Sequence, residues 1–329
     1  MASERRAVVA GANGFIGRLL VARLREAGYQ VATIGRTSQA DASWDEDLGP
    51  LVDGAALLVN LAGKNVGCRY HEAARNEILS SRVETTRVLH QAVSRAANPP
   101  QLWLNASTAT IYRHSMDAPN TEEDGRIGEG FSVDVARSWE REFFNGDLPT
   151  RRVALRMAIV LGDGPATTKL LNVARWGLGG AQHDSWWPAH RRYRGIGTDP
   201  SGPERSTWYR SGGNQLFSWI HVEDVLGAIW HIIEHPQISG PVNLAAPNPV
   251  ANRALMASLR RVAGAKFGLP SYRWMLEPAM FVLRVEPEML LKSRWALPAV
   301  LERTGYTFRY PDLDPALDDV AATLSPTRR

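Results

Sequence analysis

The segment Arg6-Ala-Val-Val-Ala-Gly11-Ala-Asn-Gly14-Phe-Ile-Gly17 decides the fold, because it leads from an apolar stretch through closely spaced glycines into an amphipathic stretch. This pattern predicts a buried strand followed by a helix. Glycines at such a junction permit a tight turn, a close approach of the backbone to a pyrophosphate, and close helix packing. A glycine-rich turn that binds nothing is the alternative, but the strand before it and the helix after it favour a nucleotide site. The predicted cofactor contacts here are Gly11, Asn13, Gly14, Phe15, Ile16 and Gly17.

The end of the next predicted strand indicates which dinucleotide is bound. An acidic residue at this point binds the ribose hydroxyls of NAD, whereas a basic residue suits the additional phosphate of NADP. The sequence here is Gly35-Arg-Thr-Ser38, and the nearest acidic residue, Asp41, comes late. Arg36 offers a planar guanidinium to a phosphate, although it is also an ordinary surface residue in an arginine-rich chain. We therefore predict NADP as the cofactor, with Arg36 as a contact.

Apolar strands continue to alternate with amphipathic helices along the first half of the chain. This alternation is typical of a parallel sheet with helices on both faces. The predicted strands span residues 6–10, 30–34, 55–61, 102–107 and 153–161, and the predicted helices span 14–27, 71–97 and 132–145. The fold class that follows is α/β, with a doubly wound, parallel Rossmann sheet.

The alternation weakens after residue 162 and then returns. Residues 216–220, 222–235 and 242–245 have the pattern of strand, helix and strand, whereas 251–324 is mostly helical with a strand-like piece at 306–310. We predict a smaller C-terminal substrate lobe that is interleaved with the first domain. The predicted division is an NADP-binding Rossmann domain at 1–162, a substrate-lobe segment at 163–221 with an inserted loop at 182–213, a return to the Rossmann sheet at 222–248, and the C-terminal substrate lobe at 249–329.

The inserted loop at 182–213 differs in composition from its surroundings. Its aromatic and basic residues stand among Gly, Pro and Ser without periodicity, at Trp186, Trp187, Trp208, Arg191, Arg192, Arg194, Arg205 and Arg210. Loops of this length are uncommon in compact domains and are often lids or mobile segments. We therefore predict a lid or a partner surface rather than a part of the core, and we expect its deletion to spare the fold.

The composition is that of a globular protein without disulfides. Of the 329 residues, 44% are apolar and 22% are charged, which excludes disordered and collagen-like classes. No run of eighteen apolar residues predicts a membrane span, and the N-terminus leads at once into a strand, so we expect a cytoplasmic location and no membrane partner. The single cysteine, Cys68, has neither a disulfide partner nor a zinc cluster, so no metal site is predicted.

The charge balance is mildly basic and favours an anionic ligand. The net charge is +4, and no Lys/Arg block is long enough for a nucleic-acid tail. The inserted loop provides charge and stacking for nucleic acid, but Asp184, Asp199 and Glu204 dilute this patch. We therefore expect no nucleic-acid partner.

Four motifs in a fixed order carry a family resemblance. The glycine segment is followed by Asn60-Leu-Ala-Gly63, Ser107-Thr-Ala-Thr-Ile-Tyr112 and Thr121-Glu-Glu-Asp124. In this order they resemble the extended short-chain dehydrogenase/reductase superfamily. Further segments that resemble its sugar-nucleotide epimerase-like branch, which has a C-terminal domain of unknown function, are Ser81-Arg-Val-Glu-Thr-Thr86, Ser218-Trp-Ile-His-Val-Glu-Asp224 and Pro241-Val-Asn-Leu-Ala-Ala-Pro-Asn-Pro249.

The resemblance implies an NADP-binding lobe and a smaller substrate lobe. It further implies cofactor contacts at Leu61, Ala62 and Gly63, and an approach of Arg156 to the nicotinamide and the substrate.

The catalytic pair of this superfamily, Tyr-x-x-x-Lys, is absent. Aligning Glu140 with the acidic residue that follows the pair places Ser132 and Ala136 at the tyrosine and lysine positions. Lysine occurs only at positions 64, 169, 266 and 292, and none of these follows a tyrosine by four residues. In the superfamily the lysine lowers the tyrosine pKa, so that the phenol acts as a general acid and base. Ordinary carbonyl reduction or epimerisation here lacks its usual proton donor.

Thr108 and Tyr112 are the remaining candidates for catalysis. Thr108 stands at the superfamily's catalytic Ser/Thr position, where its hydroxyl would bond a substrate oxygen; alternatively it is a strand-end threonine bonded to the backbone. Tyr112 would donate a proton, or else pack beneath the nicotinamide. His221 would shuttle protons, but a structural role explains it more simply, as for Asp224 near the start of a helix.

Two classes of function fit these observations. The first is an NADP(H)-dependent oxidoreductase or epimerase-like enzyme of atypical chemistry, acting on a small polar, anionic or activated carbonyl substrate. The second is a non-catalytic NADP(H)-binding sensor or scaffold protein. The absent pair favours the second class, whereas Thr108 and a full substrate lobe favour the first. The expected partners are a small-molecule substrate and, as an open alternative, a second copy in a homodimer.

Overall fold

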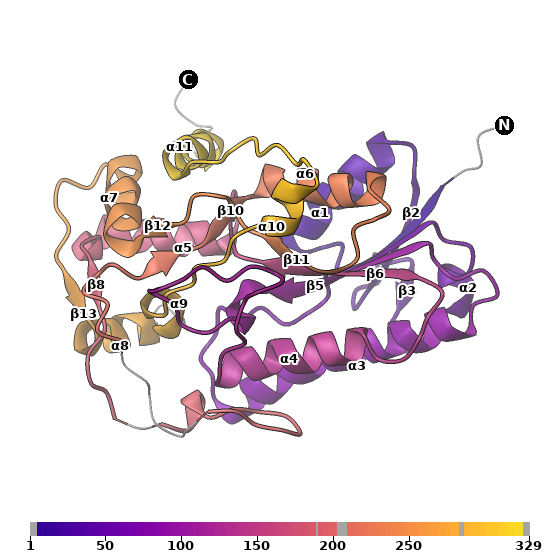
Figure 1. Ribbon diagram of the computed structural model, residues 1–329, viewed down its shortest axis with the longest axis horizontal. Helices are drawn as coiled ribbons and strands as arrows, with labels where there is room; N and C mark the ends of the chain where they lie inside the picture. Colours follow the sequence, from indigo (N-terminus) through magenta and orange to yellow (C-terminus); the bar gives the residue numbers. More distant parts are fainter. Residues whose placement is uncertain (1–4, 189, 203–208, 283–285, 325–329) are drawn as a thin grey trace.

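The computed structural model describes residues 5–188, 190–202, 209–282 and 286–324, and its centre is a seven-stranded parallel sheet (Figure 1). In spatial order the strands are β11 (Gly240–Leu244), β6 (Arg151–Met157), β5 (Leu102–Thr108), β4 (Leu57–Asn60), β1 (Arg6–Ala10), β2 (Gln30–Gly35) and β3 (Ala42–Ser43). The chain order runs outward in both directions from β1 and β4. This is the doubly wound Rossmann arrangement, so the predicted fold class is confirmed.

Helices cover both faces of the sheet. On one face lie α1 (Phe15–Glu26) and α6 (Val222–Glu234), and on the other lie α2 (Gly49–Val52), α3 (Glu72–Arg95) and α4 (Phe131–Phe143) (Figure 1). The side chains of β1 alternate between the two cores: Ala7 and Val9 pack in the first, Val8 and Ala10 in the second. Because both faces are buried, the strands are nearly continuous apolar runs, which is the pattern that predicted them.

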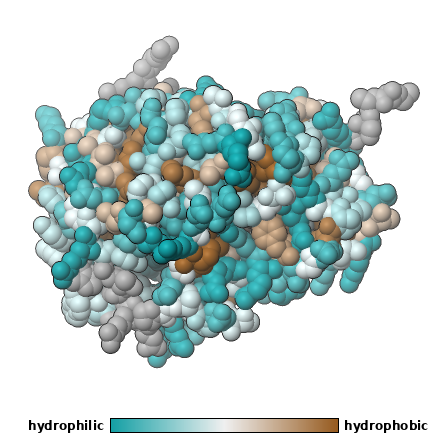
Figure 2. All heavy atoms as spheres, in the orientation of Figure 1, coloured by the Kyte–Doolittle hydropathy of each residue, from teal (hydrophilic) through white to brown (hydrophobic). Residues whose placement is uncertain are grey.

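A third hydrophobic core lies beside the sheet, among the short strands and helices on the left of Figure 1. Its short strands pair as β7 (Ile159–Leu161) with β10 (Trp219–His221), β9 (Leu216–Phe217) with β12 (Val250–Ala251), and β8 (Gln182–His183) with β13 (Ser271–Tyr272). The remaining helices are α5 (Pro165–Val173), α7 (Asn252–Ala263), α8 (Arg273–Val282), α9 (Glu288–Leu291), α10 (Ala299–Arg303) and α11 (Leu313–Leu324), with the short turns η1 (Ala109–Ile111), η2 (Ala174–Leu178) and η3 (Arg191–Tyr193). The face seen in Figure 2 is mostly hydrophilic, and hydrophobic side chains show there in small separate groups.

Two predicted strands are each divided in the structure. The stretch 153–161 forms β6 and β7, and β7 leaves the large sheet to pair with β10. The stretch 216–220 likewise divides between β9 and β10. Each stretch is apolar apart from one residue, Arg156 in the first and Ser218 in the second, so the hydrophobic pattern does not indicate the change of partner.

The prediction of a strand at 306–310 is wrong, because the backbone there bonds to a carboxylate. The N–H groups of Arg309 and Tyr310 donate to the carboxylate of Asp224 at 2.7 and 2.9 Å, and the Tyr306 hydroxyl donates to it at 3.0 Å. Asp224 is fully buried. It therefore has the structural role that its place at the start of a helix indicated.

The inserted loop is fixed to the protein in its described parts, which differs from the expectation of a segment outside the core. Arg192 is buried and forms ion pairs with Glu277 of α8 and, at 3.6 Å, with Glu286. Asp184 is also buried and pairs with Arg273 at 3.0 Å. Residues 203–208, which include the predicted surface residues Arg205 and Trp208, lie outside the described residues.

Helices of the Rossmann sheet hold the same loop from the other side. Asp134 of α4 accepts hydrogen bonds from the N–H groups of Ile196 and Ser201 at 2.9 and 2.7 Å. Arg75 of α3 donates to the carbonyl oxygens of Arg192 and Gly195 at 2.6 and 3.1 Å. Polar side chains that are far apart in the sequence hold this segment in place. Hydrophobic periodicity does not indicate such contacts.

Candidate functional site

Two cavities meet at the carboxyl edge of the sheet. The outer cavity lies over the glycine segment and the end of β2, and the inner cleft lies over the ends of β5 and β6. They share Leu61, Ala62 and Gly63, which follow β4. The cavities therefore form one continuous site at the point where the strand order reverses, which is where such sheets bind dinucleotides.

The glycine segment has no room for side chains. Gly11 has a positive φ of 79°, and a Cβ atom there would lie 2.7 Å from the carbonyl carbon of Leu61. A Cβ atom at Gly17 would lie 2.3 Å from the carbonyl oxygen of Gly11. Gly14 precedes α1 without a side-chain cap, and the first turn of α1 carries no acidic residue. The free N–H groups at this helix end therefore fit a phosphate.

The outer cavity carries a basic residue and no acid among its described lining. Arg36 and Thr37 line it, and Asn13 donates a hydrogen bond to the Thr37 hydroxyl at 3.2 Å. Asp41, the nearest acid in sequence, instead accepts bonds of 2.8 Å from the backbone N–H and the hydroxyl of Thr33. This arrangement suits a 2′-phosphate better than a bare ribose.

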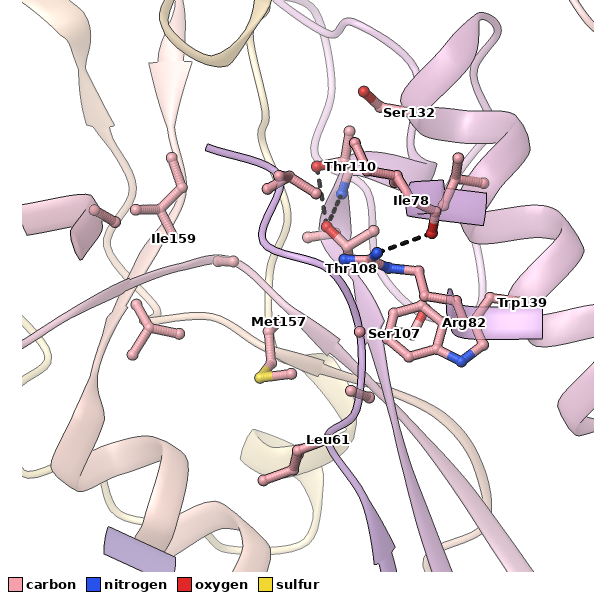
Figure 3. A pocket seen from close by; sticks show the side chains of 18 of the residues that line it. Leu61, Ile78, Arg82, Ser107, Thr108, Thr110, Ser132, Trp139, Met157 and Ile159 are labelled. Atoms are coloured by element: carbon pink, nitrogen blue, oxygen red, sulfur yellow. Dashed lines mark hydrogen bonds between the residues drawn. The ribbon is translucent and has the colours of Figure 1, made fainter. Parts of the chain in front are cut away.

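The inner cleft, of about 380 Å³, combines apolar walls with a few polar groups (Figure 3). Thr108, Ser132 and Arg82 line it from β5, α4 and α3. The Thr108 hydroxyl accepts a bond from the Thr110 N–H at 3.1 Å and lies 3.0 Å from the Thr110 hydroxyl. Thr108 thus forms the bond to the backbone that is expected of a structural threonine at a strand end, and it also faces the cleft.

The positions of the absent catalytic pair have different surroundings. Ser132 faces the cleft, whereas Ala136 is fully buried and packs with Ile111 and Tyr112. Among the described residues that line the two cavities, none is a lysine. The site has a hydroxyl at the tyrosine position and no cation at the lysine position.

Tyr112 and Arg156, both predicted as site residues, lie behind the floor of the cleft instead of lining it. The Tyr112 hydroxyl donates to Asn243 at 2.8 Å and accepts from Arg156 at 2.9 Å. Arg156 also binds the carboxylate of Glu140 through Nε and Nη2 at 2.8 and 2.7 Å. Burial raises the pKa of Tyr112. Because side chains alternate along a strand, Met157 lines the cleft while Arg156 points toward α4.

His221 has a structural environment. Its Nδ1 accepts a hydrogen bond from the Glu223 N–H at 3.2 Å, and its Nε2 lies 3.3 Å from the carboxylate of Asp319. The ring packs against Tyr310, and burial lowers its pKa. His221 does not line the inner cleft, which agrees with the structural alternative.

A polar cavity under the inserted loop was not predicted. His114, Tyr209, Arg273 and Lys292 contribute to its lining, and Phe131 lines both this cavity and the inner cleft. The His114 and Tyr209 rings stack with 3.7 Å between their centroids. Burial lowers the pKa of His114 to about 4 and that of Lys292 to about 8. These residues come from distant segments, so no local sequence signal joins them.

Within the described residues, no helix is long and apolar enough to cross a membrane. In the same part of the chain, no group of three or more His, Cys, Asp or Glu side chains is arranged to hold a metal ion.

The fold and site define a Rossmann-type protein related to nucleotide-dependent epimerases and dehydratases. Residues 7–129 match the NAD dependent epimerase/dehydratase family, and residues 273–320 match a domain of unknown function, DUF1731. The epimerase family protein SDR39U1 of Bos taurus is 30% identical over 96% of this chain and 100% of its own length. The chain therefore belongs to the epimerase family proteins of the SDR39U1 type, and the resemblance seen in the sequence is confirmed.

Solved structures agree with this assignment. The crystal structure of human SDR39U1 isoform 2 with NADPH has a TM-score of 0.79 at 27% identity, covering 96% of this chain and 99% of that chain. A nucleoside-diphosphate sugar epimerase of Corynebacterium glutamicum has a TM-score of 0.71 at 26% identity, covering 98% of this chain and 59% of that chain.

Proposed function

We propose that this protein binds NADP(H) along the continuous site and is an oxidoreductase of atypical chemistry. The observation that carries the proposal is the pair of cavities joined at Leu61–Gly63. The outer cavity suits a phosphate at Gly11 and Arg36, and the inner cleft carries the hydroxyl of Thr108. Human SDR39U1, a relative of similar fold, was crystallised with NADPH, which supports the choice of cofactor.

The chain's own residues would bind and orient the reactants rather than supply a strong acid. The bound cofactor supplies or accepts a hydride. The Thr108 and Ser132 hydroxyls would hold the substrate oxygen, and the apolar walls of the cleft would limit access of water. Since neither hydroxyl has a pKa near neutrality, a single water molecule bound beside the substrate would be the proton source. Turnover should therefore be slow except with activated acceptors such as quinones and conjugated carbonyls.

We expect Arg36→Ala to remove most of a preference for NADPH over NADH. A charge-assisted bond to phosphate contributes roughly 1.5–3 kcal/mol, so the wild-type preference should be about 10- to 100-fold. Calorimetric titration of both cofactors measures it, with Arg25→Ala at the exposed end of α1 as the matched control. Equal affinities in the wild-type protein, or an unchanged ratio in Arg36→Ala, would contradict the assignment.

Thr108→Val should lower the turnover of an activated acceptor about 100-fold while NADPH affinity is preserved, because the lost hydroxyl acts on the substrate oxygen. The measurement is NADPH oxidation with a panel of quinones and conjugated carbonyls. Tyr112→Phe is the second variant, since its hydroxyl lies behind the cleft floor. If Tyr112→Phe alone abolished turnover with normal NADPH binding, Tyr112 would be the proton donor.

A non-catalytic NADP(H)-binding sensor or scaffold remains the second candidate, and the missing Tyr-x-x-x-Lys pair favours it. Tight NADPH binding with no turnover of any acceptor would support this candidate. The cytoplasmic location, the homodimer, the small-molecule substrate and the division into domains stay predictions.

A further inference from the structure

A partly buried cation, Arg82, lines the inner cleft. Arg82 of α3 donates from Nη1 to the carbonyl oxygen of Ile78 at 3.0 Å. Within the part of the chain that the structure describes, no protein group accepts a hydrogen bond from its Nε or Nη2, and no carboxylate forms an ion pair with it. The described lining of the cleft includes a second arginine, Arg294, and no aspartate or glutamate. The cleft therefore combines apolar walls with the charge of Arg82.

The position of Arg82 is fixed by its neighbours. Its guanidinium carbon lies 5.1 Å from the centre of the Trp139 ring, and a Cβ atom at Gly63 would lie 3.2 Å from that carbon. The Trp139 indole N–H donates to Thr86 at 2.9 Å, and Asn60 donates to the same Thr86 hydroxyl at 3.3 Å. A cation held in this way loses little conformational freedom when it binds a ligand.

This arrangement accounts for the motif Ser81-Arg-Val-Glu-Thr-Thr86, to which the sequence assigned no role. The Ser81 hydroxyl accepts a bond from the Lys64 N–H at 3.0 Å, so Ser81 and Thr86 hold the turn after β4. Between them, Arg82 points from α3 toward Thr108, with Trp139 beside it (Figure 3). Two residues of the motif build the scaffold, and Arg82 faces the ligand space.

The donors that remain on Arg82 match a carboxylate. Nε and Nη2 lie on one edge of the guanidinium and bind the two oxygens of a carboxylate side by side. Arg156 of this protein uses that same pair of atoms for Glu140, at 2.8 and 2.7 Å. Burial lowers the pKa of Arg82 to about 10, so the group is still charged at neutral pH. A desolvated charge without a counter-ion is unfavourable, and an anionic ligand removes that penalty.

We infer that Arg82 binds the carboxylate of the substrate, and that the substrate is a carboxylic acid anion with an apolar or unsaturated body whose carbonyl faces Thr108. The inference rests on the proposed function, in which the inner cleft holds the substrate. The predicted phosphate contacts Gly11, Gly14 and Arg36 line the outer cavity, whereas Arg82 lines the inner cleft and not the outer cavity.

Two substitutions test this inference. Arg82→Met keeps an aliphatic chain against Trp139 and removes the charge, whereas Arg82→Lys keeps the charge and loses the two-donor edge. Ligand-observed NMR measures the Kd of benzoate and of neutral benzamide on protein saturated with NADP⁺. We expect the wild-type protein to bind benzoate at least about tenfold more tightly than benzamide, Arg82→Met to bind both equally, and Arg82→Lys to fall between. Arg87→Met, in the exposed pair with Glu142, is the control on the same helix.

NADPH affinity, measured by calorimetry on the same proteins, shows whether Arg82 binds the substrate or the cofactor. It should change less than about twofold in Arg82→Met, and melting temperature reports whether each variant is folded. An equal loss of NADPH and benzoate affinity in Arg82→Met would show that Arg82 binds the cofactor, and it would overturn the inference. The inference would also be wrong if the wild-type protein did not bind benzoate, or if it bound benzoate and benzamide equally. It would likewise be wrong if Arg82→Met still bound benzoate, or if equimolar inorganic phosphate displaced benzoate. Loss of NADPH binding by the wild-type protein would instead contradict the proposed function, and the benzoate titrations without cofactor would still decide the role of Arg82.

Discussion

Arg156→Met is expected to lower the free energy of unfolding by about 3–5 kcal/mol, because it leaves the Glu140 carboxylate buried without its guanidinium. Glu140 would keep only the Ser107 hydroxyl, which donates to it at 2.6 Å. The Tyr112 hydroxyl would also lose the donor that binds its oxygen. Since Ser107 and its neighbour Thr108 line the inner cleft, the variant should also loosen the cleft floor. Urea unfolding at neutral pH measures the change.

The exposed pair Arg87–Glu142 provides a matched control, because its carboxylate stands on α4 like that of Glu140 while Arg87 belongs to α3. It has the same two-donor geometry, with distances of 3.1 and 3.0 Å, but half of the Arg87 side chain is exposed. Surface pairs of this kind contribute about 0–1 kcal/mol, so Arg87→Met should have a small effect. The double variant Glu140→Gln/Arg156→Met should recover part of the loss, since no lone charge remains buried. Equal destabilisation by Arg156→Met and Arg87→Met would show that burial does not control this pair.

The doubly wound fold class is predictable from the sequence because the alternation that indicates it is a local pattern. Largely apolar stretches such as 6–10 and 102–107 are separated by amphipathic helices, and this alternation permits few arrangements other than a doubly wound sheet. The glycine segment is predictable for the same reason, since Gly11 and Gly17 stand where any Cβ atom would collide with the backbone. Figure 1 shows the outcome, with one layer of helices on each face of the sheet.

Side-chain partners far apart in sequence are not predictable in this way. The family resemblance implied that Arg156 lies near the nicotinamide, yet its side chain points toward α4 and Glu140. Tyr112 follows Thr108 by four residues, and the turn η1 between them carries its hydroxyl to Asn243 instead of the cleft. Both outcomes depend on which face of a strand or turn a side chain occupies. Arg82 belongs to a motif that carries the family resemblance. Only the packing of α3 against Gly63 reveals that the Arg82 side chain faces the ligand space.

The inserted loop was expected to be dispensable, and its buried arginine now predicts the opposite. Arg192 lies 7% exposed between Glu277 and Glu286, whose own side chains are buried. Arg192→Met would leave Glu277 with Arg273, at 3.4 Å, and Glu286 with Arg69, at 3.8 Å, as their described cationic partners. Because each buried carboxylate loses its Arg192 contact, we expect a loss of roughly 1.5–3 kcal/mol in the free energy of unfolding at neutral pH. Limited proteolysis within 182–213 should become faster than in the wild-type protein.

The pH dependence of this loss has a definite sign. Burial already raises the pKa of Glu286 in the wild-type protein, while the Arg192 guanidinium opposes that shift. Without Arg192 the folded-state pKa of Glu286 rises further above its unfolded value, so the folded variant binds more protons than its unfolded chain. The difference in stability between variant and wild type should consequently shrink as the pH falls through that raised pKa. Arg191→Met changes the exposed neighbour and should leave both stability and proteolysis nearly unchanged; similar effects from the two variants would mean that the buried ion pairs do not hold the loop.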